Sequence, residues 1–207
     1  MRDHATQVLV CLVTIALFSA CGSIPPTYYY RVDTESSGLT NNVQFQKSLE
    51  IAPFTADVLY QTDQIVYRNS PYQAQFYHYH RWIAPPQKLV TERVLQFYRD
   101  SNLFERVGRM SRNFPVQYVL HGNIVAFEEW DDNDTWYGIV TIQFRLLQAD
   151  TQATVWEKTI SEKAVSARKE PVAVVEAISK SLNKVVEQSA TEISAALKNG
   201  KTADPSN

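Results

Sequence analysis

Cysteine is nearly absent from this 207-residue sequence, which contains only Cys11 and Cys21. Both lie close to the N-terminus, so the rest of the chain can form no disulfide and offers no thiol as a nucleophile or zinc ligand. A folded domain in this chain must be stabilised by side-chain packing. The chain is long enough to form one domain with its own hydrophobic core.

Glycine is also scarce, with six residues, and none stands in a Gly-x-Ser-x-Gly motif or a phosphate-binding loop. The chain therefore lacks the usual signatures of serine hydrolases and of nucleotide-binding proteins. Its formal net charge is −2, with no basic tract, so it has no electrostatic footprint for nucleic acid. The sequence predicts a protein that is not an enzyme and that does not bind nucleic acid.

Three groups of polar residues could carry chemistry, and each has a simpler structural interpretation. His78 and His80 would lie about 7 Å apart on one strand face, but the sequence offers no third ligand nearby to complete a zinc site. The tetrapeptide Asp131-Asp132-Asn133-Asp134 lacks the glycine and closing glutamate of a calcium loop and is typical of a hairpin turn. Glu128 and Glu129 are adjacent on a predicted strand, so they point to opposite faces and cannot form a glycosidase pair. We predict no catalytic residue, no metal site and no cofactor.

The N-terminus has the features of a secretory signal peptide. The apolar run from Val8 to Phe18 is shorter than the ~20 residues that span a membrane, and it fits the apolar region of a signal peptide. The motif Phe18-Ser19-Ala20-Cys21 resembles a bacterial lipobox, although phenylalanine replaces the usual leucine. We therefore predict that residues 1–20 are removed and that Cys21 carries a covalent lipid.

The residues after the cysteine indicate location and a tether. Gly22 takes the place of the aspartate that retains enterobacterial lipoproteins in the inner membrane, which favours the periplasmic side of the outer membrane. Residues 21–42 are predicted to be the acylated cysteine and a tether poor in core-forming residues. The β-favouring segment Tyr28-Tyr29-Tyr30-Arg31-Val32 interrupts this tether and should pair with or pack on the domain.

Residues 43–198 are predicted to form one α+β domain, followed by a disordered tail at 199–207. Three long alternating segments separated by polar turns predict an antiparallel meander. Helical spacing of apolar residues after Pro85-Pro86, and again from Pro171 to about Lys198, predicts two helices. The predicted architecture is a two-layer sandwich, an antiparallel sheet covered by the two helices. The expected strands are 43–54, 60–67, 76–82, 104–107 and, in the meander, 117–130, 136–147 and 154–165.

Aromatic residues crowd one short segment of the chain. Tyr72, Phe76, Tyr77, Tyr79 and Trp82 fall within eleven residues, more than one strand can bury in a single core. Strand alternation places Tyr77 and Tyr79 on one face and Phe76 and Trp82 on the other. Because aromatic residues are enriched in interfaces, these five residues are a candidate partner surface. The alternative, in which both faces pack within the protein, is left open.

The order of several motifs resembles that of one known family. The lipobox Cys21 is followed by Tyr29-Tyr30-Arg31-Val32, and the first strand leads to Tyr60-Gln61-Thr62-Asp63-Gln64-Ile65-Val66-Tyr67. The pattern Tyr79-x-x-Trp82-x-x-Pro85-Pro86 then opens a helix that ends at Ser101-Asn102-Leu103-Phe104. With the meander and the long final helix, this order resembles the ABC-type transport auxiliary lipoproteins, the family that includes the lipoprotein of the paraquat-inducible system.

The resemblance implies an auxiliary component of an MCE-type system that moves lipids between the inner and outer membranes. Its partners would be a periplasmic MCE-domain protein and, through it, an ABC permease and ATPase. The family has no catalytic residues to carry over to this chain. Two other functions are left open: a structural outer-membrane assembly lipoprotein, either pilotin-like or an insertion helper, and a periplasmic hydrolase with an unrecognised site. A homo-oligomer is also left open.

Overall fold

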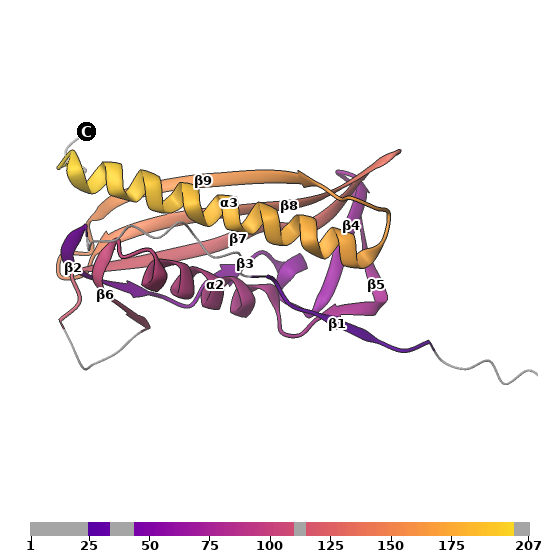
Figure 1. The fold of residues 1–207 in the computed structure, drawn as a ribbon, viewed down its shortest axis with the longest axis horizontal. Helices are drawn as coiled ribbons and strands as arrows, with labels where there is room; N and C mark the ends of the chain where they lie inside the picture. The colour runs from indigo at the N-terminus through magenta and orange to yellow at the C-terminus, as the bar shows by residue number, and fades with distance from the viewer. Residues whose placement is uncertain (1–24, 34–43, 110–114, 201–207) are drawn as a thin grey trace, which may run out of the picture.

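The computed structural model describes residues 25–33, 44–109 and 115–200, and Figure 1 shows their arrangement. The predicted signal peptide, the lipidation site Cys21, most of the predicted tether and most of the predicted tail lie outside these residues. The boundaries of those segments therefore stay predictions.

The described residues form a nine-stranded sheet, two α-helices and one turn of 3-10 helix, η1. In chain order the elements are β1 (Tyr28–Tyr30), β2 (Phe45–Ile51), β3 (Thr55–Ala56), η1 (Val58–Tyr60), β4 (Gln64–Ser70), β5 (Gln73–Trp82), α2 (Pro86–Asp100), β6 (Phe104–Arg109), β7 (Tyr118–Asp132), β8 (Thr135–Gln148), β9 (Thr154–Val165) and α3 (Pro171–Lys198).

The three longest strands form the meander that the sequence predicts. β7 pairs antiparallel with β8, and β8 pairs antiparallel with β9. In the turn between β7 and β8, Asn133 has a φ of 52°, in the left-handed region that asparagine tolerates better than most side chains. The polar residues of this segment thus serve as a turn, as predicted.

The rest of the sheet is mixed, which corrects the prediction of a wholly antiparallel sheet. β2, β3 and β4 each pair parallel with β7, one after another along the edge that β8 leaves free. Leu49 of β2 lies opposite Tyr118 near the start of β7, and Val66 of β4 lies opposite Glu128 near its end. β6 continues the sheet beside β2, while β5 and then β1 continue it beside β4. Side-chain alternation reports which face of a strand is buried and not the direction of its neighbour.

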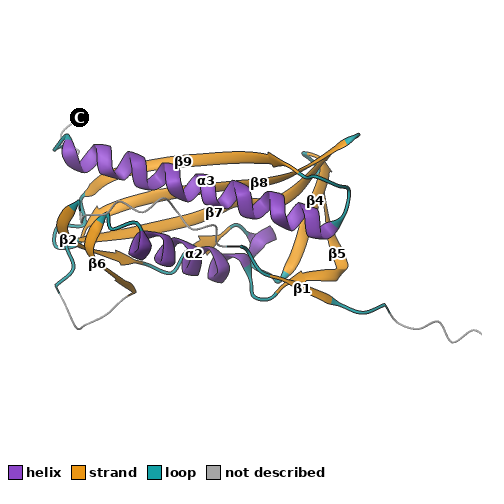
Figure 2. Ribbon diagram, in the orientation of Figure 1, coloured by secondary structure: helices purple, strands orange, loops and turns teal. Residues whose placement is uncertain are grey.

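Both helices cover the same face of the sheet, which confirms the two-layer α+β class (Figures 1 and 2). α3 has 28 residues and is therefore about 42 Å long. It runs along β8 and β9 and buries Val174, Ile178 and Leu182 completely. The helix begins at Pro171, where the missing N–H of proline costs nothing because the first-turn donors have no helical partner.

A glycine on β8 lets α3 approach the sheet backbone. A Cβ at Gly138 would lie 2.3 Å from the backbone nitrogen of Ile178 and 2.5 Å from the carbonyl carbon of Ala177. Ser181 of α3 also donates a 2.8 Å hydrogen bond from its hydroxyl to the carbonyl oxygen of Gly138. The absence of a side chain at this position therefore sets how closely α3 packs on the sheet.

Two buried polar links join the helices. Arg93 of α2 donates from Nε to Oδ1 of Asn183 at 2.8 Å, and the hydroxyls of Tyr98 and Ser189 are 2.9 Å apart. All four residues are nearly inaccessible to solvent, so each polar group depends on its partner. Burial raises the pKa of Tyr98 above its ordinary value, which keeps its hydroxyl protonated. These pairs fix the position of α2 along α3.

Candidate functional site

The predicted lipid anchor lies just ahead of the first described residues. Cys21 stands four positions before Pro25, where the described chain begins. Within the described ranges, no helix is long and apolar enough to cross a membrane. The structure therefore does not test lipidation of Cys21, which stays a sequence prediction.

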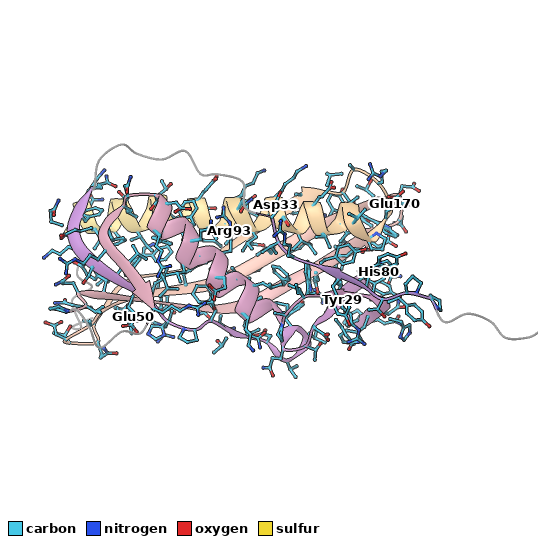
Figure 3. All side chains as sticks on the ribbon, turned by 60° about the horizontal axis from the view of Figure 1, so that its bottom comes forward. Tyr29, Asp33, Glu50, His80, Arg93 and Glu170 are labelled. Atoms are coloured by element: carbon cyan, nitrogen blue, oxygen red, sulfur yellow. The ribbon has the colours of Figure 1, made fainter. Side chains whose placement is uncertain are left out.

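The segment around Tyr28 to Tyr30 pairs with the domain, as the sequence predicts. β1 pairs parallel with β5, with Tyr28 opposite His80 and Tyr30 opposite Trp82. The backbone N–H of Ile83 donates to the carbonyl oxygen of Tyr30 at 2.7 Å and extends this pairing by one residue. Figure 3 shows Tyr29 and His80 close together at this end of the molecule.

His80 holds β1 against β5 and does not form part of a metal site in the described residues. Its Nδ1 is 2.8 Å from the hydroxyl of Tyr30, and its ring stacks on the rings of Tyr28 and Tyr30. Burial lowers the pKa of His80 below its ordinary value, which favours the neutral ring. His78 is exposed, and no group of three metal-ligating side chains occurs in the described parts of the chain.

The five aromatic residues of the candidate partner surface have very different environments. Trp82 is fully buried, and its ring packs against Phe127 with centroids 5.0 Å apart. Phe76 is half-buried and packs on the core. Trp82 is therefore a core residue, which corrects its inclusion in an exposed contact surface.

Tyr77 points inward, whereas Tyr79, which strand alternation is predicted to place on the same face, is exposed. Its ring lies 4.9 Å from the ring of Tyr67, and its hydroxyl donates a 2.8 Å hydrogen bond to Glu129. The cause is a shift in the pairing of β4 with β5: Gln64 lies opposite Arg81, but Val66 lies opposite Phe76. Extra residues on β5 interrupt the simple alternation of faces at this point.

Tyr72 and Tyr79 are the exposed members of the aromatic set. Tyr72 is 95% exposed in the turn between β4 and β5, and Tyr79 is 40% exposed farther along β5. Neither phenol hydroxyl takes part in the hydrogen bonds described above. Their side chains are thus accessible to a partner.

Two acidic residues buried in β7 form separate networks that the sequence did not predict. Glu128 accepts hydrogen bonds from the hydroxyl of Tyr60 at 2.5 Å and from Nε of Arg68 at 3.0 Å. Glu129 accepts from Tyr77 and is 1% exposed. Because neighbouring strand residues point to opposite faces, the two carboxylates do not converge on one bond, in line with the sequence argument.

Burial raises the pKa of one residue in each of these two networks. Burial, partly opposed by the Tyr77 hydrogen bond and assisted by the charge of Asp131, raises the pKa of Glu129 to about 7. Burial and the bond to Glu128 raise the pKa of Tyr60 above its ordinary value. The only sequence signal for these networks is the occurrence of two acids inside an otherwise apolar strand, since their partners are remote in the chain.

Two surface grooves flank α2. One has a volume of about 630 Å³ and lies between the C-terminal parts of α2 and α3, with Phe97, Leu103, Ala190 and Lys198 in its lining. The other has a volume of about 550 Å³ and lies beside the N-terminal half of α2, near Phe54. Neither lining contains a nucleophile paired with a base, so neither groove has the geometry of an acyl-transfer site.

The fold is similar to two solved structures. The protein XCC0632 from Xanthomonas campestris, of the DUF330 family, has a TM-score of 0.75 and 19% identity over 84% of this chain and 98% of its own. A second structure, of an uncharacterised protein, has a TM-score of 0.64 and 13% identity over 82% of this chain and 99% of its own. At these identities the likeness concerns the fold alone. No curated protein matches the sequence.

A family model gives the assignment that the motif order predicts. The model described as ABC-type transport auxiliary lipoprotein component matches residues 31–190. This span runs from just after β1 into the second half of α3, and it contains all the strands of the sheet except β1. The chain belongs to the family of ABC-type transport auxiliary lipoprotein components.

Proposed function

We propose that this protein is a lipid-anchored periplasmic auxiliary component of an MCE-type ABC transport system, which moves lipids between the inner and outer membranes. The observation that carries the proposal is the family match over residues 31–190, because it associates the chain with an ABC transporter. The lipobox at Cys21 supports an anchored position, and Gly22 supports the outer membrane. The resemblance in motif order supports the MCE class.

In this proposal the lipoprotein docks other components and performs no chemistry. The sequence has no phosphate-binding loop, so ATP hydrolysis belongs to another chain. A periplasmic MCE-domain protein is the direct partner, and it links the lipoprotein to the ABC permease and ATPase. The contact surface that we propose consists of Tyr72, in the β4–β5 turn, and Tyr79, farther along β5, whose side chains are both exposed.

Substitution of Cys21 by serine is expected to abolish the lipid anchor. Without a thiol at the lipobox cleavage point there is no atom to receive the diacylglyceryl group, and the protein should leave the membrane fraction. Metabolic labelling with radioactive palmitate measures this directly. Wild-type protein should be labelled and recovered with the outer membrane; a labelled Cys21→Ser variant, or an unlabelled wild type, would show that the lipobox assignment is wrong.

Replacing Tyr72 and Tyr79 together by alanine is expected to weaken binding to the MCE-domain protein. Truncating an aromatic residue at the centre of an interface costs about 2 kcal/mol or more of binding free energy. A loss of this size weakens binding roughly thirtyfold. Because both side chains are exposed, the melting temperature should change little. Co-purification from membranes after crosslinking, with the partners identified by mass spectrometry, measures the effect.

Two control variants separate contact from folding. Val165→Ala removes an apolar side chain that is 61% exposed on β9, a strand separated from β4 by β8 and β7, and should leave co-purification intact. Trp82→Ala should instead lower the melting temperature, because truncating a buried tryptophan costs about 3–5 kcal/mol. Retained binding in the double tyrosine variant would move the contact elsewhere. Failure of the intact lipoprotein to recover any MCE-domain protein would contradict the transport function.

A further inference from the structure

Three large apolar side chains at the β1 end of the sheet are left uncovered by the described residues. Tyr28 is 52% exposed, Tyr29 is 63% exposed and Ile83 is 66% exposed. They surround the edge strand β1: Tyr28 and Tyr29 pair with His80 and Arg81 of β5 and point to opposite faces of the sheet, and the backbone of Ile83 bonds to the next residue of β1. We call Tyr28, Tyr29 and Ile83 the β1 patch. Isolated exposed apolar residues are common, but a cluster marks an interaction surface.

The β1 patch is held rigidly on the domain. Tyr30, whose hydroxyl lies 2.8 Å from Nδ1 of His80, secures β1 to β5. Downstream of β1, the backbone N–H of Asp33 donates to the hydroxyl of Ser179 on α3 at 3.1 Å. The strand is thus attached both to the sheet and to the helix layer, so its exposed side chains keep a fixed direction relative to the whole domain.

The patch is also the first folded part of the chain after the predicted anchor. Seven residue steps separate Cys21 from Tyr28, and a fully extended chain of that length spans at most about 25 Å. A lipid on Cys21 places that residue at the bilayer surface. The β1 patch therefore cannot lie farther than this distance from the headgroups, and it can lie within them.

The chemistry of the patch suits the polar–apolar boundary of a bilayer. Tyrosine rings have an apolar body and a polar hydroxyl, and they concentrate at the level of the lipid headgroups. Ile83 adds apolar surface that gains from leaving water. Arg31 follows β1 and is exposed, so its positive charge can interact with anionic headgroups.

We infer that the β1 patch lies in the headgroup layer of the membrane that holds the lipid anchor, as a second, non-covalent membrane contact. This inference rests on the lipid anchoring of the proposed function. It gives the contact a mechanical role: the anchor sets the distance of the domain from the bilayer, and the patch sets its orientation. The end of the molecule with β1 faces the lipid.

Quenching of a fluorophore by nitroxide-labelled lipids tests the placement of the β1 patch in the intact, acylated lipoprotein. Because the mature sequence has no cysteine other than the acylated Cys21, a cysteine introduced at Tyr29 or Ile83 can be labelled uniquely with an NBD fluorophore. The matched control is Glu105→Cys, an exposed position on β6, which lies at the other end of the strand order from β1. The labelled proteins are reconstituted into vesicles of phosphatidylethanolamine and phosphatidylglycerol that contain a headgroup-level nitroxide lipid.

The nitroxide lipid is expected to quench the label at Tyr29→Cys and at Ile83→Cys and to leave the label at Glu105→Cys unquenched. In a further variant, Tyr28→Ser combined with Tyr29→Ser should reduce the quenching of the label at Ile83→Cys. The Ile83 position keeps the test informative if a substitution within β1 disturbs its pairing.

Flotation of the vesicles separates the possible failures. Protein that floats with the vesicles but shows no quenching at either patch position, or equal quenching at Glu105→Cys, would overturn the membrane contact and leave the anchor intact. Protein that does not float with the vesicles would contradict the lipid anchor and, with it, the inferred membrane contact. A label whose fluorescence changes only when an MCE-domain protein is added would assign the patch to a protein partner instead. Co-purification with the transporter does not depend on any of these results.

Discussion

Replacing Gly138 with valine is expected to prevent α3 from docking on the sheet and to unfold the domain. Even the first side-chain carbon would lie 2.3 Å from a backbone atom of Ile178, and a helix backbone cannot move aside at one residue alone. α3 would have to lift from β8 and expose side chains such as Ile178 and Leu182, each worth about 1.5–3 kcal/mol when buried. The combined loss is comparable with the ~5–15 kcal/mol that stabilises a whole domain.

Thermal and urea denaturation followed by circular dichroism measure this effect. Gln143→Val is the matched control, because Gln143 lies on the same strand and is exposed. The control should melt close to the wild type, while Gly138→Val should aggregate or show no cooperative transition. A soluble Gly138→Val protein with a wild-type melting temperature would contradict the close packing of α3 on β8.

The parts of this fold that could be predicted are those that depend on local sequence. α3 begins at Pro171 because proline suits the first turn of a helix, and its apolar stripe fixes the buried face. β9 starts and ends where its alternating pattern does, from Thr154 to Val165. In both elements the residues that specify the structure are neighbours in the chain, so no knowledge of distant partners is needed.

The parallel pairing of the shorter strands depends on distant partners and could not be predicted. β2 and β4 lie far from β7 in sequence, and their apolar patterns would suit neighbours of either direction. The long β7 decides the outcome, because its length provides positions for several short strands along one edge. The prediction of an antiparallel sheet therefore holds for β7 to β9 and fails for most of the other pairs.

In the candidate site, too, some features depend on local sequence and others depend on distant partners. Cys21 is predicted from four consecutive residues of a lipobox, whereas the exposure of an aromatic side chain depends on what packs over it. Trp82 and Tyr72 belong to the same aromatic segment, yet Phe127 covers the first and nothing in the described residues covers the second. The shift in β5 that turns Tyr77 toward Glu129 arises from pairing with β4, and no feature of β5 alone indicates it.

The contribution of Glu129 to the stability of the domain is expected to fall as the pH rises from about 4.5 to about 7. Burial, together with the charge of Asp131 and despite the Tyr77 hydrogen bond, raises the pKa of Glu129 from 4.5 to about 7. Between these values the folded protein retains a proton that the unfolded chain has released. Folding is therefore favoured at the acidic end of the range, and this contribution is lost as the pH approaches 7.

The size of the effect follows from the difference between the two pKa values. A pKa difference of one corresponds to about 1.4 kcal/mol, so the loss attributable to Glu129 is at most about 3.5 kcal/mol. Glu129→Gln removes the titrating group while its amide oxygen can still accept the hydrogen bond from Tyr77. We expect this variant to equal the wild type near pH 4.5, to exceed its stability near pH 7.5, and to show a flatter dependence in between.

Urea denaturation at pH 4.5, 6.0 and 7.5 measures these differences, with Tyr77→Phe as the comparison. The phenylalanine variant keeps the aromatic ring but removes the hydrogen bond that lowers the pKa of Glu129, so its loss of stability should extend to higher pH. Subtracting the Glu129→Gln curve from the wild-type curve isolates the contribution of this one group. Parallel curves for the two proteins would mean that Glu129 ionises in the folded state as it does in the unfolded chain, which would contradict its burial in the folded domain.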